Sequence, residues 1–337
     1  MPEKVYMLNG QIVPEAEARI SPLGSDPMFA YGMIDRLRTF RGTDGRMRMV
    51  GLAQHLSRCQ ATAAALFGAD IGDLRRSWAD QLARAALATE LGEVYLHLGY
   101  GQMSSPGTML QGASAGLTTF VFAKHEGPLY QGRDGNAVYV STEPQWPRPD
   151  GPLTAHKTHG YQELLWLKNR ARARRPDKDA RSVEALLLAR DSFRFDRDSR
   201  NWVVAEDDPL TAECGCTCAF ALDRQGNLHL PARAVRYFRG VTVQIVEALF
   251  RAYFPDKQVL HDLRRSHLLH NGGTAGTAGG VVPIVEVDKK TCERTEQFDA
   301  LAALYCKLCW GELNRRDLQE QWAPVIATGM SQQVAVG

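Results

Sequence analysis

Residues 212–231 read "AECGCTCAFALDRQGNLHLP" and have the alternation of a β-strand that ends in a turn. In a strand, side chains at positions i and i+2 share a face and stand about 6.8 Å apart. One face would carry Cys214, Cys216, Cys218 and Phe220, and the other Glu213, Gly215, Thr217 and Ala219. Because Glu213 stands among residues too small to obstruct a ligand, we predict that its carboxylate is the functional group of this stretch.

The three cysteines of the same stretch suggest a metal site or a redox switch, but their spacing argues against a metal. Zinc bound by thiolates at about 2.3 Å needs sulfur atoms within roughly 4 Å of one another. Neighbours on one face of a straight strand are farther apart than that. We therefore predict no metal site and assign the cysteines to a packing face. A metal- or redox-binding protein built on them is the third-ranked alternative.

The composition is that of a globular protein of the cytoplasm. A chain of 337 residues with 44% apolar residues suits two domains of moderate size. A net charge of +2 gives no reason to expect nucleic acid or an anionic membrane as partner. Neither a secretory signal nor an apolar run of roughly 20 residues is visible. Seven cysteines without the spacing of a disulfide framework favour a reducing compartment.

Residues 1–124 have the periodicities of an α+β domain. The segment "KVYMLNGQIV" predicts a hairpin around Asn9–Gly10, and apolar residues at helical spacing predict helices over 51–68 and 74–91. Strand patterns before and after these two helices favour a mainly antiparallel sheet. The polar, Gly-rich residues 125–136 are typical of a linker, so we expect a boundary between two domains there.

Residues 137–337 form the expected C-terminal domain, which contains an unusual lysine. "PLTAHKTHGYQ" places Lys157 between His156 and His159, just ahead of a predicted helix near residues 160–174. The chain has nine lysines against thirty-one arginines. A lysine where arginine is the preferred cation suits imine formation, which arginine cannot perform. A solvated surface lysine is the alternative.

The Gly-rich segment "GGTAGTAGG" (residues 272–280) leaves two interpretations open. A dinucleotide fingerprint would follow a strand and open a helix. Here the β-branched "VVPIVEV" follows instead, which predicts a strand and disfavours that fingerprint. Either loop amides, with the hydroxyl of Thr274 or Thr277, bind a small phosphate, or the segment is a simple turn.

Five motifs follow one another along the chain: "HLSR" at 55–58, "KTHGY" at 157–161, the opening stretch, "RGVTVQIV" at 239–246 and "GTAGGVVPI" at 276–284. In this order they resemble the fold-type IV, or class IV, pyridoxal-phosphate enzymes. This family includes branched-chain and D-amino-acid aminotransferases and aminodeoxychorismate lyases. The resemblance implies an α+β fold of two domains, a smaller N-terminal α/β sandwich and a larger C-terminal α/β pseudo-barrel.

The resemblance also implies a role for each matching residue. Lys157 would carry pyridoxal 5'-phosphate as a Schiff base and transfer the substrate's Cα proton. Glu213 would pair with the pyridine nitrogen and Tyr161 with the ring oxygen. The phosphate would be bound by Arg58, Val241, Thr242, Thr277 and Ala278.

The chain also departs from the family pattern. In "YGMIDRLRTF", Asp35 stands where a glutamate is usual, and Tyr100 stands where D-amino-acid members have an arginine. We expect Arg36 or Arg38 to bind the substrate carboxylate in its place and Tyr100 to belong to the same substrate site. Cys218 replaces an asparagine. Residues 192–209 look like an insertion that packs over the site or against a second subunit.

The resemblance implies amino transfer between an amino acid, or an amine, and a 2-oxo acid in a homodimer. Two alternatives remain open. The first is a lyase of the aminodeoxychorismate type that uses the same cofactor residues. The second is a non-catalytic binding protein that kept the fold, for which the altered first-strand motif is the best support.

Overall fold

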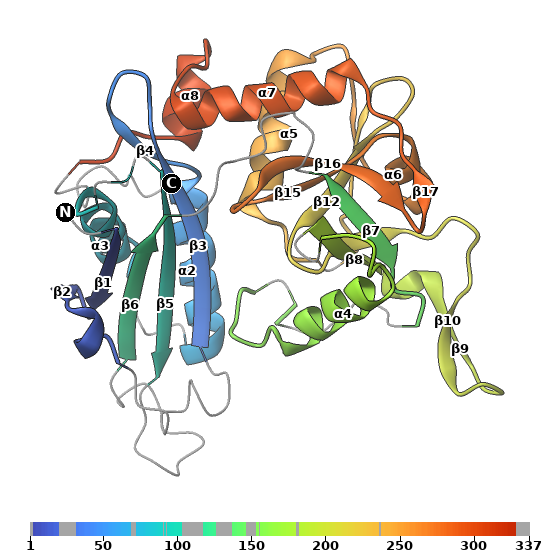
Figure 1. Cartoon of the computed structure of the whole chain (residues 1–337), viewed down its shortest axis with the longest axis horizontal. Helices are drawn as coiled ribbons and strands as arrows, with labels where there is room; N and C mark the ends of the chain where they lie inside the picture. The colour runs from blue at the N-terminus through green and yellow to red at the C-terminus, as the bar shows by residue number, and fades with distance from the viewer. Residues whose placement is uncertain are drawn as a thin grey trace. The chain divides into compact units, whose positions relative to one another are not determined.

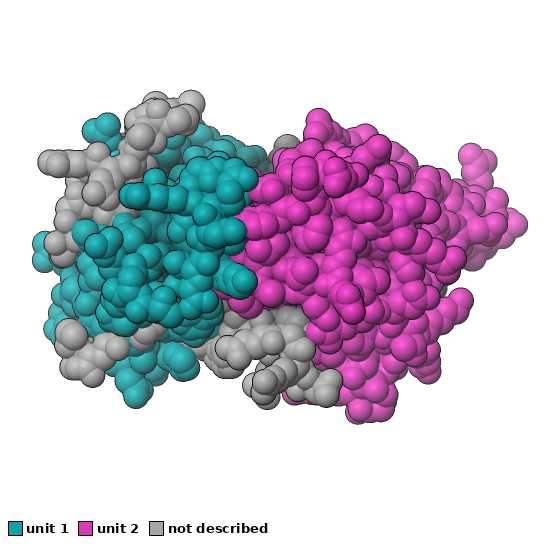
Figure 2. All heavy atoms as spheres, turned by 90° about the horizontal axis from the view of Figure 1, so that it is seen from above, with its two compact units in different colours: residues 1–127, 156–160, 307–337 teal, residues 128–155, 161–306 magenta. Residues whose placement is uncertain are grey.

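The computed structural model describes residues 3–19, 32–68, 72–89, 91, 93–102, 117–125, 137–145, 153–154, 156–179, 182–235 and 237–327. Contacts within the chain divide it into two compact units (Figure 2). Unit 1 contains residues 1–127, 156–160 and 307–337, and unit 2 contains residues 128–155 and 161–306. Each unit has its own sheet and core.

These units differ from the expected domains in two segments. Residues 156–160 and 307–337 group with unit 1, although the sequence placed them in the C-terminal domain. The expected linker, residues 125–136, lies outside the described residues except for His125. The domain boundary therefore stays a prediction.

Unit 1 is built on an antiparallel sheet of six strands in the order β2-β1-β6-β5-β3-β4 (Figure 1). The strands are β1 (Lys4–Leu8), β2 (Gln11–Val13), β3 (Gly32–Arg41), β4 (Met47–Met49), β5 (Glu93–Gln102) and β6 (Leu117–Lys124). The predicted hairpin is confirmed, with φ of 49° at Asn9 and 81° at Gly10. These positive φ values suit the tight turn that joins two strands, which explains the Asn-Gly pair. A short 3-10 helix, Glu15–Glu17, follows β2.

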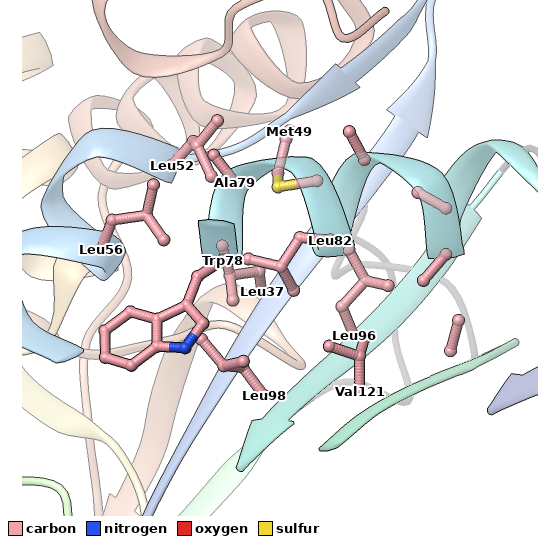
Figure 3. Close-up of a cluster of buried hydrophobic side chains, with 14 of the residues drawn as sticks. Leu37, Met49, Leu52, Leu56, Trp78, Ala79, Leu82, Leu96, Leu98 and Val121 are labelled. Carbon is pink, nitrogen blue, oxygen red and sulfur yellow. The ribbon is translucent and has the colours of Figure 1, made fainter. Parts of the chain in front are cut away.

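Helices α2 (Leu52–Phe67) and α3 (Arg75–Leu87) pack on one face of this sheet and confirm both predicted helices. Trp78 and Leu82 of α3 meet Leu37, Leu96 and other strand residues in a single core (Figure 3). Strand β4 also bonds to a segment from much later in the chain: the Ile326 N–H donates to the Met47 carbonyl at 2.8 Å. Helix α8 (Arg316–Trp322) precedes that contact.

Unit 2 contains a mixed sheet of nine strands in the order β11-β8-β7-β16-β15-β12-β13-β14, with β17 paired to β16. The strands are β7 (Val138–Thr142), β8 (Val183–Leu188), β11 (Thr211–Cys214), β12 (Cys218–Leu222), β13 (Leu228–Leu230), β14 (Val259–His261), β15 (Gly272–Gly276), β16 (Gly280–Val287) and β17 (Lys290–Thr291). The pairs β7–β8, β7–β16 and β13–β14 are parallel, and the others are antiparallel.

The other helices are α4 (Gln162–Ala173), α5 (Val241–Tyr253), α6 (Arg265–Asn271) and α7 (Glu296–Trp310). Helix α4 confirms the helix predicted near residues 160–174. The expected insertion, residues 192–209, follows a 3-10 turn (Arg190–Ser192) and contains a separate hairpin of β9 (Phe193–Asp196) and β10 (Asn201–Val204), which projects from unit 2 (Figure 1). Phe193 at its base is buried, whereas Phe195 is 51% exposed.

The opening stretch is not one straight strand, so the predicted alternation is wrong. Strand β11 ends at Cys214 and β12 begins at Cys218, and the Cys214 N–H donates to the Thr217 carbonyl at 3.0 Å across a tight turn. The Gly215 N–H donates instead to Ala185 of β8 at 2.9 Å. A period of two in small residues does not distinguish a strand from a turn, because no bulky side chain fixes the faces.

Within the described residues, no helix is long and apolar enough to cross a membrane.

Candidate functional site

The Lys157 segment is anchored to unit 1 through its backbone. The Ile34 N–H of β3 donates to the Lys157 carbonyl at 3.2 Å, and the His159 N–H donates to the Gly32 carbonyl at 2.9 Å. The Lys157 N–H in turn lies 3.4 Å from Oγ1 of Thr62 on α2. These contacts hold a half-buried lysine beside β3 and α2, which explains why residues 156–160 group with unit 1.

A buried ion pair lies on the same two elements. Asp35 of β3 is 1% exposed and accepts hydrogen bonds from Arg58 of α2, with Nη2 at 2.6 Å from Oδ1 and Nε at 3.0 Å from Oδ2. His55 Nδ1 is 3.0 Å from the same Oδ1. The bidentate geometry fixes the guanidinium plane. Arg58 is thus preorganised by a carboxylate that the sequence marked only as a departure from a family pattern.

Charges in this cluster act on one another. Burial alone would raise the pKa of Asp35, but the charge of Arg58 and the contact with His55 outweigh it and hold the pKa of this carboxyl well below its usual range. Burial lowers the pKa of His55, and the charges of Arg58 and Lys157 lower it further against the opposing effect of Asp35. The cluster therefore contains an ionised aspartate, and Lys157 is close enough for its charge to act on His55.

The three residues suggested for substrate binding lie apart from this cluster. Arg36 and Arg38 alternate with Asp35 along β3, so they lie on the opposite face of the sheet. Arg38 is 1% exposed and donates to Glu93 at 2.8 Å. Tyr100 packs in the core of unit 1, edge-on to Phe67 and Trp78, and its burial raises its pKa to about 12. Substrate binding by these residues stays a prediction.

In unit 2, Glu213 is the third residue of β11 and is 4% exposed. The turn that follows it packs on α4, because a Cβ added at Gly215 would lie 3.6 Å from the Leu164 carbonyl and 3.8 Å from Cβ of Lys168. Tyr161 occupies the N-cap position of the same helix. The β11–β12 turn and the start of α4 thus place Glu213 and Tyr161 in neighbouring elements of unit 2.

The start of α5 has the features of a helix end that can bind an anion. Its N-cap is Gly240, and no described side chain caps this end of the helix. Val241 and Thr242, 2% and 3% exposed, are its first two residues. The first turn of a helix carries backbone N–H groups without intrahelical partners and the positive end of the helix dipole. Cys218 Sγ orients this end, because it accepts from the Gly240 N–H at 3.1 Å.

The Gly-rich segment is the tight turn of a hairpin. Gly276 of β15 pairs with Gly280 of β16, and Thr277 and Ala278 lie in the turn between them. A Cβ added at Gly276 would lie only 2.9 Å from Cγ2 of Thr217, so the hairpin packs directly on the β11–β12 turn. Successive backbone amides in such a turn can bind a phosphate. The strand that follows rules out the dinucleotide arrangement, as the sequence predicted.

Two groups of predicted residues result. Unit 1 contains Arg58 and Lys157, and unit 2 contains Tyr161, Glu213, Val241, Thr242, Thr277 and Ala278. Asp35, His55 and the Cys218–Gly240 contact were missed as partners. The spacing of His55 and Arg58, three residues apart on a helix, was the available signal for an acidic partner on the adjacent strand.

No protein-family model matches the sequence, and no curated protein matches it significantly. Solved structures match it over nearly the whole chain. A branched-chain aminotransferase from Thermoproteus uzoniensis, solved with norvaline, matches with a TM-score of 0.74 and 18% identity. The match covers 95% of this chain and 98% of the chain of that enzyme. The Escherichia coli branched-chain amino acid aminotransferase has a TM-score of 0.76 and 15% identity, with coverage of 96% and 98%.

A third solved structure, of the branched-chain amino acid aminotransferase from Thermobaculum terrenum in its PLP form, has a TM-score of 0.74 and 15% identity, with coverage of 95% and 97%. The agreement covers both units and nearly the full length of each enzyme. The resemblance inferred from the motifs is thereby confirmed at the level of the fold. The chain has the two-domain α/β fold that these aminotransferases share.

Proposed function

We propose that the protein is a class IV pyridoxal-phosphate-dependent aminotransferase. The observation that carries the proposal is that the start of α5 and the β15–β16 turn both contact the segment that follows Glu213 in unit 2, Gly240 through Cys218 and Gly276 through Thr217. Neighbours in fold are described with pyridoxamine 5'-phosphate, in a PLP form, and with a phosphopyridoxyl-glutamate adduct. The motif order in the sequence is consistent with the same cofactor.

The residues present fit a phosphorylated pyridine cofactor. The backbone amides at the start of α5 and in the β15–β16 turn suit a phosphate, and the Thr242 and Thr277 hydroxyls are further donors. Gly276 leaves no room for a Cβ against Thr217, so this turn keeps its backbone close to the β11–β12 turn. Arg58, whose guanidinium is oriented by Asp35, is the cation that the motif resemblance assigns to the phosphate.

Each residue has a distinct task in this proposal. A bound pyridoxal phosphate supplies an electron sink for the bond broken at the substrate's Cα. Lys157 holds the cofactor through Nζ and moves the proton at Cα. Buried Glu213 holds the proton on the ring nitrogen, and the amide turns keep the phosphate in one orientation. The substrates are an amino acid, or an amine, and a 2-oxo acid.

The test begins with the covalent link. Purified protein incubated with pyridoxal phosphate and reduced with borohydride should retain the cofactor, and peptide mass spectrometry should place it on Lys157. Lys157→Ala should lose both the label and activity. Lys307→Ala, a change at an exposed lysine of α7, should keep both. A colourless protein that cannot be reconstituted would sink the proposal.

A half-reaction screen then identifies the reaction. Amino donors of both enantiomeric series are added singly, and conversion to the pyridoxamine form is followed by absorbance. Conversion that a 2-oxo acid reverses supports aminotransfer. Pyruvate release from aminodeoxychorismate without an acceptor would show the lyase instead, and cofactor binding without any conversion would show a binding protein.

The proposal includes a homodimer located in the cytoplasm. The apolar side chains of Leu165 and Trp166 on α4 and of Phe195 on β9 are about half exposed, at 51%, 45% and 51%. Large exposed apolar side chains of this kind are common where a second subunit packs. Light scattering after size exclusion should give twice the chain mass. A monomer at micromolar concentration would contradict the dimer and leave the cofactor test unaffected.

A further inference from the structure

Unit 2 contains a second cluster of chemically active side chains, away from the residues assigned to the cofactor. His229, Asp262 and His267 each offer one ligand atom, and these atoms all lie within 4.8 Å of one another. His229 lies on β13, Asp262 follows β14, and His267 lies on α6. Among the described residues this is the one group of three or more His, Cys, Asp or Glu with such spacing.

Each ring nitrogen of His229 faces a carboxylate oxygen, and this arrangement is suited to binding a cation. Its ring is buried, with Nδ1 2.7 Å from Oδ1 of Asp262 and Nε2 3.1 Å from Oδ2 of Asp223. A neutral imidazole carries one N–H, so it can donate to only one of these two carboxylates. The other nitrogen then directs a lone pair at a carboxylate oxygen. That contact is favourable only when a second proton or a metal ion lies between the two atoms.

His267 indicates which cation fits. Its ring centroid is 3.9 Å from that of His229, and its ligand atom lies within 4.8 Å of those of His229 and Asp262. A second N–H on His229 would serve both Asp223 and Asp262 but would leave His267 out of the arrangement. A metal ion would be bound by both histidines and by Asp262. At His267 the metal would replace the weak hydrogen bond that Nδ1 accepts from the Arg264 N–H at 3.3 Å. That bond is lost if Nδ1 binds the metal, and also if Nε2 does, because Nδ1 then carries the proton.

We propose that His229, Asp262 and His267 bind a divalent transition-metal ion of the zinc class. Two imidazoles and one carboxylate suit zinc, cobalt, nickel or copper. With metal–ligand distances of roughly 2.0–2.2 Å, the three ligand atoms must shift from their present spacing, which the 52% exposed side chain of Asp262 permits. Asp223 accepts the Nε2–H of His229 and so orients the ring from the second layer.

The ion would join three elements at one end of unit 2. Strands β13 and β14 pair in parallel, and α6 leads directly into β15, the strand that ends at the Thr277–Ala278 turn. Binding to His267 would tie the start of α6 to the edge of the sheet. The expected effect is stabilisation of unit 2, because an ion that binds only the folded state favours that state. The site does not depend on the proposed amino transfer.

The test uses the full-length chain, stripped with a chelator and dialysed. Titration with Co²⁺ should produce visible absorption that saturates at one equivalent, and Zn²⁺ should displace the cobalt and raise the thermal midpoint. Asp262→Asn and His267→Gln should each weaken Co²⁺ binding tenfold or more. Asp223→Asn should weaken it about 10–100-fold, as loss of an orienting partner does.

Two controls separate the site from general histidine or thiol binding. His270→Gln alters the same helix, but His270 pairs with Glu293 at 2.8 Å outside the cluster, so binding should persist. Cys216→Ser removes an exposed thiol and should change nothing. The proposal is overturned if the wild-type chain shows no saturable cobalt absorption. It is also overturned if binding survives in His267→Gln and Asp262→Asn variants whose circular dichroism is native.

Discussion

The two groups of candidate residues are built from different chemistry. In unit 1, Asp35, His55 and Arg58 are side chains whose charges depend on one another. In unit 2, the start of α5 and the β15–β16 turn present backbone amides, whose donors are the same whatever the side chains are. The first group should respond to pH and to loss of a single charge. The second should respond mainly to changes in shape.

Breaking the buried pair of unit 1 should have the largest effect. Asp35→Asn or Arg58→Gln leaves one buried group without its charged partner, and each should lower the free energy of unfolding by about 3–5 kcal/mol. The double variant should lose less than the sum, because neither charge is then left alone. Urea denaturation of the full chain measures all three.

The control for this cycle is an exposed pair of the same type. Asp73 lies 2.8 Å from Arg75 at the surface of unit 1, with its side chain 45% exposed. Asp73→Asn should leave the denaturation midpoint nearly unchanged, since solvent screens the pair. Additive losses in the Asp35–Arg58 cycle would show that the two residues do not act as one unit.

The backbone group should instead be sensitive to added volume. Gly276→Val places its Cβ near the 2.9 Å position beside Thr217 Cγ2, which forces the two turns apart. Overpacking of this kind costs about 1–3 kcal/mol. Pyridoxal phosphate should therefore bind about tenfold or more weakly, while the stability of unit 1 should change little. Fluorescence titration of the cofactor measures the change. Gly279→Ala in the same turn meets only a Val282 methyl at 3.3 Å and should cost less.

The acid response should distinguish the two groups again. The pKa of Asp35 is lowered in the folded chain, so its contribution to stability is complete above its unfolded pKa of about 4 and is lost as pH falls below it. The wild-type unfolding free energy should therefore fall steeply between about pH 4 and pH 2. In Asp35→Asn this part of the slope should disappear. An unchanged slope would mean that other carboxylates govern acid unfolding.

Features that depend on a side-chain pattern within one element were predictable from the sequence, whereas the turn at residues 215–217 and the contact between Asp35 and Arg58 were not. Side-chain patterns identified the buried stripe of α2, and a rare lysine among histidines drew attention to Lys157. The error at residues 215–217 arose because small residues alternate in a turn as readily as in a strand. The Asp35–Arg58 pair was missed because sequence spacing on one element does not state which neighbouring strand faces it.

The smallest effects should come from the cysteines that border the backbone group. Cys218 Sγ accepts from the Gly240 N–H and donates to the Phe238 carbonyl, both at 3.1 Å, and so links β12 to the start of α5. Cys218→Ala removes both bonds at a typical net value of about 1 kcal/mol, which predicts cofactor binding several-fold weaker. Cys218→Ser keeps a donor and an acceptor and should recover most of the loss.

Cys216 provides the matched control for that change. It is exposed in the β11–β12 turn, whereas Cys214 and Cys218 are buried and burial raises the pKa of Cys214 well above its usual value. A thiol reagent should therefore modify Cys216 before either neighbour. Because the amides at the start of α5 and in the β15–β16 turn do not depend on this thiol, its modification should leave cofactor affinity unchanged. A loss of cofactor affinity equal to that of Cys218→Ala would mean that side chains of the β11–β12 turn, and not only its backbone, position the start of α5 and the β15–β16 turn.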